Sequence, residues 1–482
     1  AGDKNWPIAC SHATLGDAGE ELDLSGAHLS YGDFEEATFQ AEGAIRLNGT
    51  GLEHANLRGS NITATNLGLG ADATIDFRHA DLDNADLSGS ELTAKGGAYG
   101  AIFFYRTDLN HANLSGSELT AEGGENGHIN FAQADLAHAD LSGSELTAEG
   151  RGEIGRIVIT GADLTNADLS GSKLTAEGES GKIAFSDADL TNADLSGSKL
   201  TAEGDEQNGQ INLSGADLTN ADLSGSELTA VGKVFGSIEF SQAVLTNANL
   251  SVSELTVEGG NSGNINFNSA DLTNADVSVS ELTAGGGESS SINFSGADLV
   301  NASLSGSEIT AEGRGKIGNI VFSGADLTNA DLSGSELTAE GGKQANLVFA
   351  GGTLANADLS GSKLTAEAGE TGKIFFSGAD LTNADLSVSE LTAEGEQYGG
   401  IKFDGANLAN ASLSGSELTA NDTIDFGGVG SLPLADLSGS TLTAPTIIGL
   451  PSPPSPPTQP PSPQPSTPPA LPSPPPPSPP PP

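Results

Sequence analysis

The chain has 482 residues, of which 18 are Lys or Arg and 65 are Asp or Glu, so its formal net charge at pH 7 is −47. A surface with this excess of carboxylates repels phosphate, which excludes nucleic acid and anionic membranes as expected partners. No stretch has the roughly 18 or more apolar residues that a membrane-spanning helix needs, and the single cysteine excludes an internal disulfide framework.

The first 21 residues do not follow the pattern of the rest of the chain. This segment opens without Met and holds the only Trp, Trp6, and the only Cys, Cys10. We expect residues 1–21 to form an N-terminal cap, because the end strand of a repetitive sheet must be covered. The missing Met and the absence of an apolar signal core are typical of a processed secreted protein and equally of a trimmed chain. Cys10 is a candidate for an intermolecular disulfide, with a buried free thiol as the alternative.

Residues 22–444 repeat one phrase, clearest at residues 292–311 as INFSGADLVNASLSGSEITA. Each repeat has four five-residue units and an insert of six to eight residues in most copies. The 15 centres of the SELTA unit run from Ile62 to Leu442 at spacings of 24 to 30 residues, and one looser repeat precedes them, which gives 16 repeats. Almost all length variation lies in the insert, so the insert is predicted to be a surface loop.

Apolar and polar residues alternate within each five-residue unit. The central residue is Leu or Phe, the residue two before it is Ala, Ser or Ile, and the residues between and after are polar. This alternation predicts strands that point small and large side chains into a narrow coil. Two columns are expected to stack along the coil: a buried column of Phe residues, and an exposed column of amides able to form a ladder. The amide column is Asn166, Asn192, Asn220, Asn247, Asn274, Asn301, Asn329, Asn356, Asn383 and Asn410.

Units of the form A(D/N)LXX resemble those of pentapeptide-repeat proteins over residues 22–444. The resemblance implies an all-β fold, a right-handed, four-sided β-solenoid of about 16 turns with one short loop per turn. Two features depart from the family pattern: the INF unit has Ile in place of the small inward residue, and every turn carries an insert. A three-sided solenoid with one longer face therefore remains an alternative.

The end of the chain changes in composition. Residues 445–450 are predicted to be a C-terminal cap and junction, and residues 451–482 hold 20 of the 23 prolines and no charged residue. Such a segment forms polyproline II, which rises about 3.1 Å per residue. Its SPPPP runs resemble the hydroxyproline-rich glycoproteins of plant and green-algal walls and algal flagellar appendages, which implies prolyl hydroxylation and O-linked sugars. The candidate residues are Ser473, Pro474, Pro475, Ser478, Pro479 and Pro480.

Asn-X-Ser/Thr sequons occur at nine positions. In a secreted protein these are candidates for N-glycosylation, and in the predicted register none requires a buried sugar. They are Asn48, Asn61, Asn113, Asn212, Asn249, Asn293, Asn301, Asn410 and Asn421.

Columns of Asp and Glu are expected about 4.8 Å apart along the coil. Ca²⁺ could bridge neighbouring carboxylates in such a column, and we take Asp163, Asp189 and Asp217 as the candidate ladder. The alternative is a solvated acidic surface that keeps rods apart. A Thr column beside the Glu column suggests ice binding, which the flanking carboxylates disfavour.

No residue stands out as catalytic, since every carboxylate is one of many copies and the inserts are short and alike. We therefore predict no enzyme and no cofactor other than possible Ca²⁺ and N- and O-linked glycans. The predicted function is that of an extracellular structural glycoprotein, a subunit of a cell-wall, surface-coat or flagellar-appendage fibre. It would self-associate through its termini and contact other wall glycoproteins or polysaccharide. The alternatives are a DNA-mimicking, topoisomerase-binding pentapeptide-repeat protein, and an ice- or calcium-binding surface rod.

Overall fold

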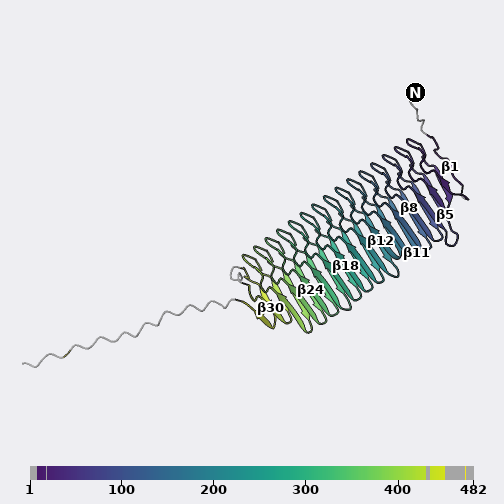
Figure 1. Ribbon diagram of the computed structural model, residues 1–482. Coiled ribbons are helices and arrows are strands. Elements are labelled where there is room, and N and C mark those ends of the chain that lie inside the picture. Colours follow the sequence, from purple (N-terminus) through teal and green to yellow (C-terminus); the bar gives the residue numbers. More distant parts are fainter. Residues whose placement is uncertain (1–7, 18, 430–434, 451–472, 474–482) are drawn as a thin grey trace, which may run out of the picture.

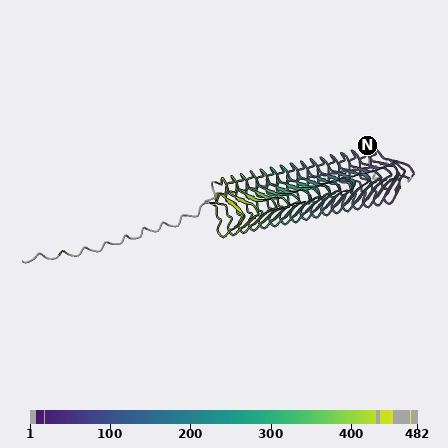
Figure 2. The same ribbon diagram turned by 90° about the horizontal axis from the view of Figure 1, so that it is seen from below.

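The computed structural model describes residues 8–17, 19–429, 435–450 and 473. These residues coil into a long rod, with strands of successive turns lying side by side along its axis (Figure 1). Every strand pairing is parallel, and the described part of the chain contains no helix. The predicted all-β solenoid of about 16 turns is thereby confirmed. Seen from below, the rod keeps nearly the same cross-section over most of its length (Figure 2).

Each regular turn contributes two strands, which we call the A-strand and the B-strand. The A-strands hold the SELTA units: β1 Thr14–Leu15, β3 Thr38–Glu42, β5 Asn61–Asn66, β7 Glu91–Gly96, β9 Glu118–Gly123, β13 Lys199–Gly204, β15 Glu227–Gly232, β17 Glu254–Gly259, β19 Glu281–Gly286, β21 Glu308–Gly313, β23 Glu336–Gly341, β25 Lys363–Ala368, β27 Glu390–Gly395, β29 Glu417–Ala420 and β31 Thr441–Thr443.

The B-strands follow the A-strands and end in the INF units: β2 Leu22–Asp23, β4 Ala44–Arg46, β6 Asp72–Asp76, β8 Tyr99–Phe103, β10 Asn126–Asn130, β14 Asn208–Asn212, β16 Phe235–Glu239, β18 Ser262–Asn266, β20 Ser289–Asn293, β22 Ile317–Val321, β24 Gln344–Val348, β26 Thr371–Phe375, β28 Tyr398–Lys402, β30 Thr423–Asp425 and β32 Thr446–Ile448. In two turns one strand, β11 Glu145–Val158 or β12 Lys173–Ala184, supplies both parts.

Successive turns pair in register, so equivalent residues stack in columns. Leu282 pairs with Ile309, and Ile292 pairs with Ile320. The pairing reaches back to Thr14 in the segment predicted as the N-terminal cap and forward to Ile448 at the predicted C-terminal junction. Each backbone strand is thus hydrogen-bonded on both edges except in the first and last turns.

Three tight turns and the bend between the A- and B-strands give each coil four corners, so the solenoid is four-sided. The second residue of each tight turn has positive φ, as at Gly296 (63°), Asn301 (57°) and Gly306 (65°). Glycine has no Cβ to clash in this conformation, and Asn tolerates it better than most residues. This requirement explains the columns of Gly and Asn in the repeat.

The insert is mostly strand, which corrects the prediction of a surface loop. Between β19 and β20 only Gly287 and Glu288 lie outside strands. The A- and B-strands extend past the square core and converge, and the backbones nearly touch there. A Cβ on Gly209 would lie 2.0 Å from the carbonyl oxygen of Val231 and 2.4 Å from that of Ala202. A Cβ at Gly209 would therefore force the backbone of the neighbouring strands to move.

The core is one continuous cluster of Leu, Ile, Phe, Ala and Val. The predicted Phe column is confirmed, with ring centroids 4.7–5.0 Å apart and interplanar angles of 1–4° from Phe240 to Phe426. Ile159 and Leu213 interrupt it on either side of Phe185. Offset stacking of such rings adds about 0.5–1.5 kcal/mol per pair to the stability that burial provides.

Candidate functional surfaces

The outward side chains of the A-strands form an acidic surface, which we call face A. On the twelve A-strand segments from β7 to β27, three outward positions each give 36 side chains, of which 18 are Glu, four are Lys and twelve are Thr. Lys199 pairs with Glu227 at 2.6 Å and Lys363 pairs with Glu336 at 2.5 Å. These two lysines relieve the repulsion within the Glu column locally.

Repulsion remains elsewhere on face A. The pKa of Glu177 is raised above its usual value by partial burial and by the neighbouring Glu203 and Glu149. The pKa of Glu340 is raised for the same reasons, with Glu312 and Glu367 as its neighbours. Face A therefore attracts cations and disfavours its own full ionisation.

The outward side chains of the B-strands form a second surface, face B, with a different composition. The twelve B-strand segments from β8 to β28 also present 36 outward side chains. One of them is acidic, Glu239, and four are basic: Arg156, Lys182, Lys373 and Lys402. The pKa of Glu239 is raised by burial, which disfavours even this one negative charge. The remaining side chains are mainly amides, hydroxyls, aromatic rings and aliphatic groups.

The other two sides carry the Asp columns, including the candidate calcium ladder. Asp163, Asp189 and Asp217 pair in consecutive turns, so the structure brings them into one column. One oxygen of each carboxylate accepts the backbone N–H two residues later, at 2.9–3.0 Å. Among the described residues no group of three or more His, Cys, Asp or Glu has the arrangement of a metal site. Calcium binding by this ladder stays a prediction.

None of the nine sequon asparagines is buried. Two of them, Asn212 and Asn293, lie on face B at the ends of β14 and β20. Asn301 and Asn410 belong to the predicted amide ladder, which the structure forms: nine successive bonds of 2.9–3.1 Å join Nδ2 of one Asn to Oδ1 of the Asn in the preceding turn. A glycan on Asn301 would replace a hydrogen of the Nδ2 group that this ladder uses.

Cys10 is half-buried and packs against the hydrophobic core, and its backbone N–H donates to the carbonyl oxygen of Asp33 at 2.7 Å. The thiol is free in the single chain. An intermolecular disulfide at Cys10 stays a prediction. Ser473 is exposed, and Pro474, Pro475, Ser478, Pro479 and Pro480 lie outside the described residues.

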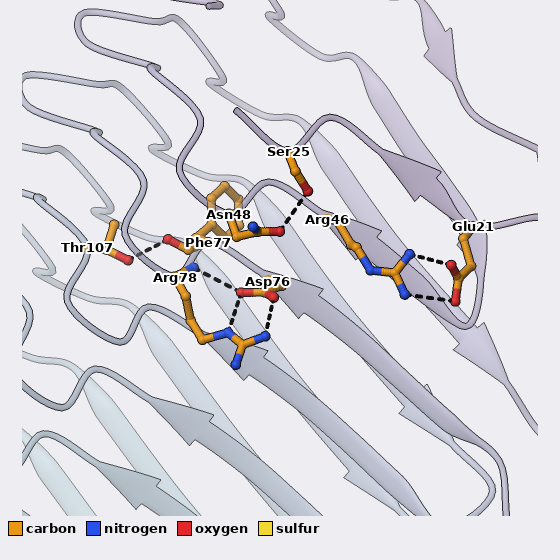
Figure 3. Close-up of polar contacts among 8 residues, drawn as sticks. All are labelled: Glu21, Ser25, Arg46, Asn48, Asp76, Phe77, Arg78 and Thr107. Carbon is orange, nitrogen blue, oxygen red and sulfur yellow. Dashed lines mark hydrogen bonds and ion pairs between the residues drawn. The ribbon is translucent and has the colours of Figure 1, made fainter. Parts of the chain in front are cut away.

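A polar cluster near the N-terminal end was missed by sequence reasoning (Figure 3). Nη1 and Nη2 of Arg46 donate to the two carboxylate oxygens of Glu21. Arg78 binds Asp76 through Nε at 2.8 Å and Nη2 at 2.6 Å. The hydroxyl of Ser25 donates to Oδ1 of the sequon residue Asn48 at 2.7 Å. The sequence feature that could have predicted this cluster is the presence of arginine in these loosely repeated turns. Because both arginines are paired, the cluster stabilises the first turns and leaves no free cation for an anionic ligand.

A shallow groove of about 450 Å³ runs along the edge of face A next to the bends. Lys233 and Arg314 flank it, and Val231 and Gly285 line it where the Glu column is interrupted. Its floor is the glycine backbone of consecutive turns.

No helix in the described residues could serve as a membrane span.

Comparison with known proteins identifies pentapeptide repeats in two segments of the chain. Eight copies of pentapeptide repeats match residues 209–231 and 316–339. No curated protein has significant sequence similarity to the chain. Among solved structures, the chain is similar to HetL, a pentapeptide repeat protein involved in heterocyst differentiation regulation from the cyanobacterium Nostoc sp. strain PCC 7120. The two are 19% identical, with 70% of this chain and 86% of HetL covered and a TM-score of 0.15.

Two further solved structures show the range of these similarities. QnrB1, a plasmid-mediated fluoroquinolone resistance protein, is 17% identical, with 58% of this chain and 91% of QnrB1 covered and a TM-score of 0.15. A tailspike protein of E. coli bacteriophage HK620, in complex with pentasaccharide, is 11% identical, with 90% and 70% covered and a TM-score of 0.29. The fold therefore rests on the chain's own strand pairing.

That pairing defines a parallel β-solenoid built from five-residue units. Within this solenoid, residues 209–231 and 316–339 match pentapeptide repeats. The hydroxyproline-rich character of the tail has no support from these comparisons and stays a prediction.

Proposed function

We propose that the chain is the rod of an extracellular structural glycoprotein, a subunit of a wall layer, surface coat or appendage fibre. The observation that carries the proposal is the uniformity of the rod. Equivalent residues stack in register from Thr14 to Ile448, so nearly every polar side chain of the repeat has copies above and below it. A catalytic or ligand site needs a unique constellation, whereas a mechanical element needs a regular hydrogen-bonded ladder.

Stiffness follows from this ladder. About 16 turns at about 4.8 Å each give a rod of about 77 Å. Ring stacks inside and amide ladders outside run in the same direction as the backbone hydrogen bonds. Bending the rod would stretch all three on one side at once.

The proline-rich segment 451–482 and the sequons support an extracellular location. Nine exposed or half-exposed sequon asparagines can carry sugars without unfolding the rod. The proline-rich segment 451–482 is uncharged and about 100 Å long when extended as polyproline II. A connector of this length reaches along a whole neighbouring rod.

Deletion of residues 451–482 tests the proposal. The full chain and the deletion variant would be secreted from a eukaryotic host that hydroxylates proline and adds sugars, and imaged by negative-stain electron microscopy. We expect the full chain to form fibres in which rods of about 77 Å follow one another, and the variant to form single rods with unchanged circular dichroism.

Two outcomes would contradict this. Fibres of unchanged length from the deletion variant would show that the tail does not join subunits. A full chain that stays monomeric at high concentration with its sugars present would rule out the fibre.

A further inference from the structure

Face B is nearly free of negative charge in a protein whose net charge is −47. Its 36 outward positions carry four positive charges and one negative charge, whereas the 36 positions of face A in the same turns carry four positive and 18 negative charges. The remaining sides carry the Asp columns. The area with few acidic residues is therefore confined to one side and continues through twelve turns.

Large apolar side chains stand on face B at regular intervals. Tyr99 occupies the first outward position of β8. From β11 onward, this position holds Ile154, Phe235, Ile317 and Tyr398 in every third turn. Of these, Ile154 is 37% exposed, Phe235 50% and Tyr398 57%. Between them the same column holds smaller polar residues such as Ser262 and Ser289. Apolar ridges about 14 Å apart thus alternate with gaps two turns wide.

The charge distribution selects the partner. Face A of a second rod would bury 18 carboxylates under four cations, and desolvated carboxylates without partners are costly. A polyanion would meet the repulsion of the whole rod. Face B of a second copy brings mainly amides, hydroxyls and apolar groups, with four cations and the single carboxylate of Glu239. Because the ridges are evenly spaced, those of one rod fit the gaps of the other.

The size of face B agrees with this partner. Twelve strands about 4.8 Å apart and about 16 Å long cover about 900 Å² on each rod. Stable, specific protein interfaces bury about 800 Å² on each partner.

We propose that two rods pair side by side through face B, with the same surface contributed by each copy. The pairing is lateral and does not involve the tail, so it goes beyond the joining of rods through their termini. It also gives the sequons Asn212 and Asn293 a regulatory position, because a glycan on either one would stand on the interface.

The test measures mass per unit length by small-angle X-ray scattering on the full chain, made in a host without N-glycosylation. This quantity doubles on lateral pairing and is unaffected by end-to-end joining. The variant Ser237→Glu with Ser291→Glu places two carboxylates on face B, two turns apart. The matched control, Thr229→Glu with Thr283→Glu, places them on face A in the same turns. Circular dichroism melting establishes that both variants are folded.

We expect the parent chain and the face A variant to have twice the mass per unit length of a single rod. The face B variant should have the mass per unit length of a single rod. Raising NaCl from 50 to 500 mM should preserve or strengthen pairing, because salt screens the repulsion between acidic rods. A chain made with glycans on Asn212 and Asn293 should be single, and Asn212→Gln with Asn293→Gln should restore the pair.

A parent chain with the mass of one coil would overturn the proposal, as would a face B variant that stays doubled. Pairing lost at high salt would mean that face A binds face B. Single rods that gain mass only with an added soluble neutral β-glucan would make face B a polysaccharide-binding surface.

Discussion

Three valines hold a backbone conformation that suits glycine. Val252, Val279 and Val388 have φ of 57–59°, at the corner where other turns have Gly, such as Gly306. Their side chains are 63–72% exposed, so burial does not compensate for the clash of a β-branched side chain in this conformation. These positions store local strain.

Replacing Val279 by Gly should therefore stabilise the rod by about 1 kcal/mol, since the left-handed conformation costs an L-residue about 1–2 kcal/mol. Chemical denaturation would measure the change in the free energy of unfolding. The matched control is Val244→Gly, in a column with ordinary backbone angles, which should destabilise. Loss of stability in both variants would show that the Val279 corner is unstrained.

His128 is the only buried histidine in the described residues, and it lies on a B-strand. Its Nδ1 lies 2.8 Å from the hydroxyl of Tyr99, and among the described residues its Nε2 has no hydrogen-bond partner. Burial, with Arg156 nearby, lowers the pKa of His128 from 6.5 to about 4. The folded state thus holds the neutral ring, whereas the unfolded chain takes up a proton below pH 6.5.

The unfolded state binds more protons between these two pKa values, so this group removes stability as the pH falls from about 6.5 to about 4. Replacing His128 by Asn, the residue found in the same column at Asn264 and Asn319, removes this effect. Between pH 7 and pH 5 the parent should lose about 2 kcal/mol more stability than His128→Asn, measured by urea unfolding. Parallel pH profiles would contradict a buried neutral ring.

At the scale of the strand, the convergence of A- and B-strands depends on glycine. Replacing Gly209 by Ala would force a Cβ against carbonyl oxygens of both sheets. We expect the free energy of unfolding, measured by thermal melts, to fall by about 3 kcal/mol or more. The reason is that backbone rather than a flexible side chain must move.

Ser290 occupies the same column as Gly209 and already has a Cβ. Its hydroxyl is buried without a hydrogen-bond partner among the described residues. Ser290→Ala should therefore be neutral or slightly stabilising in the same thermal melts. Equal tolerance at both positions would show that the sheets are not in contact at Gly209.

Sequence reasoning succeeded for the 20-residue frame and failed for the insert. Alternation placed Ala297 and Leu299 inside and Asp298 outside, as the structure does, and the spacing of Asn residues predicted the amide ladder. Glycine-rich inserts of variable length are also typical of loops, which is why the sequence predicted a loop here. The reason for glycine within these strands is the short distance between the two sheets, which the sequence does not reveal. Face B was missed for the same reason, since half of it lies in the insert.

At the scale of the whole molecule, the net charge is −47, and columns on three sides of the rod contribute many of its carboxylates. Carboxylates in neighbouring turns repel each other by about 0.9 kcal/mol per pair in water before screening. Salt therefore should raise the melting temperature smoothly.

Calcium should act no differently from sodium at matched ionic strength if the Asp columns are solvated. We expect this result, because one oxygen of each carboxylate in the Asp163, Asp189 and Asp217 ladder is already bound to backbone. Thermal melts in millimolar CaCl₂ and in NaCl of equal ionic strength provide the comparison. A larger effect of calcium, reversed by chelator, would instead establish the ladder as a binding site.

The sameness of the turns has a consequence for how the chain folds. A strand that pairs one turn out of register still places Leu beside Leu and Thr beside Thr. Such an error therefore loses little more than the contacts of one terminal turn. Departures from the repeat remove this degeneracy: Ile159 and Leu213 interrupt the Phe column, and Val257 stands in a column of Ala. Growth of the coil from one nucleus, turn upon turn, avoids the error altogether, because each new turn then has a single free edge to join.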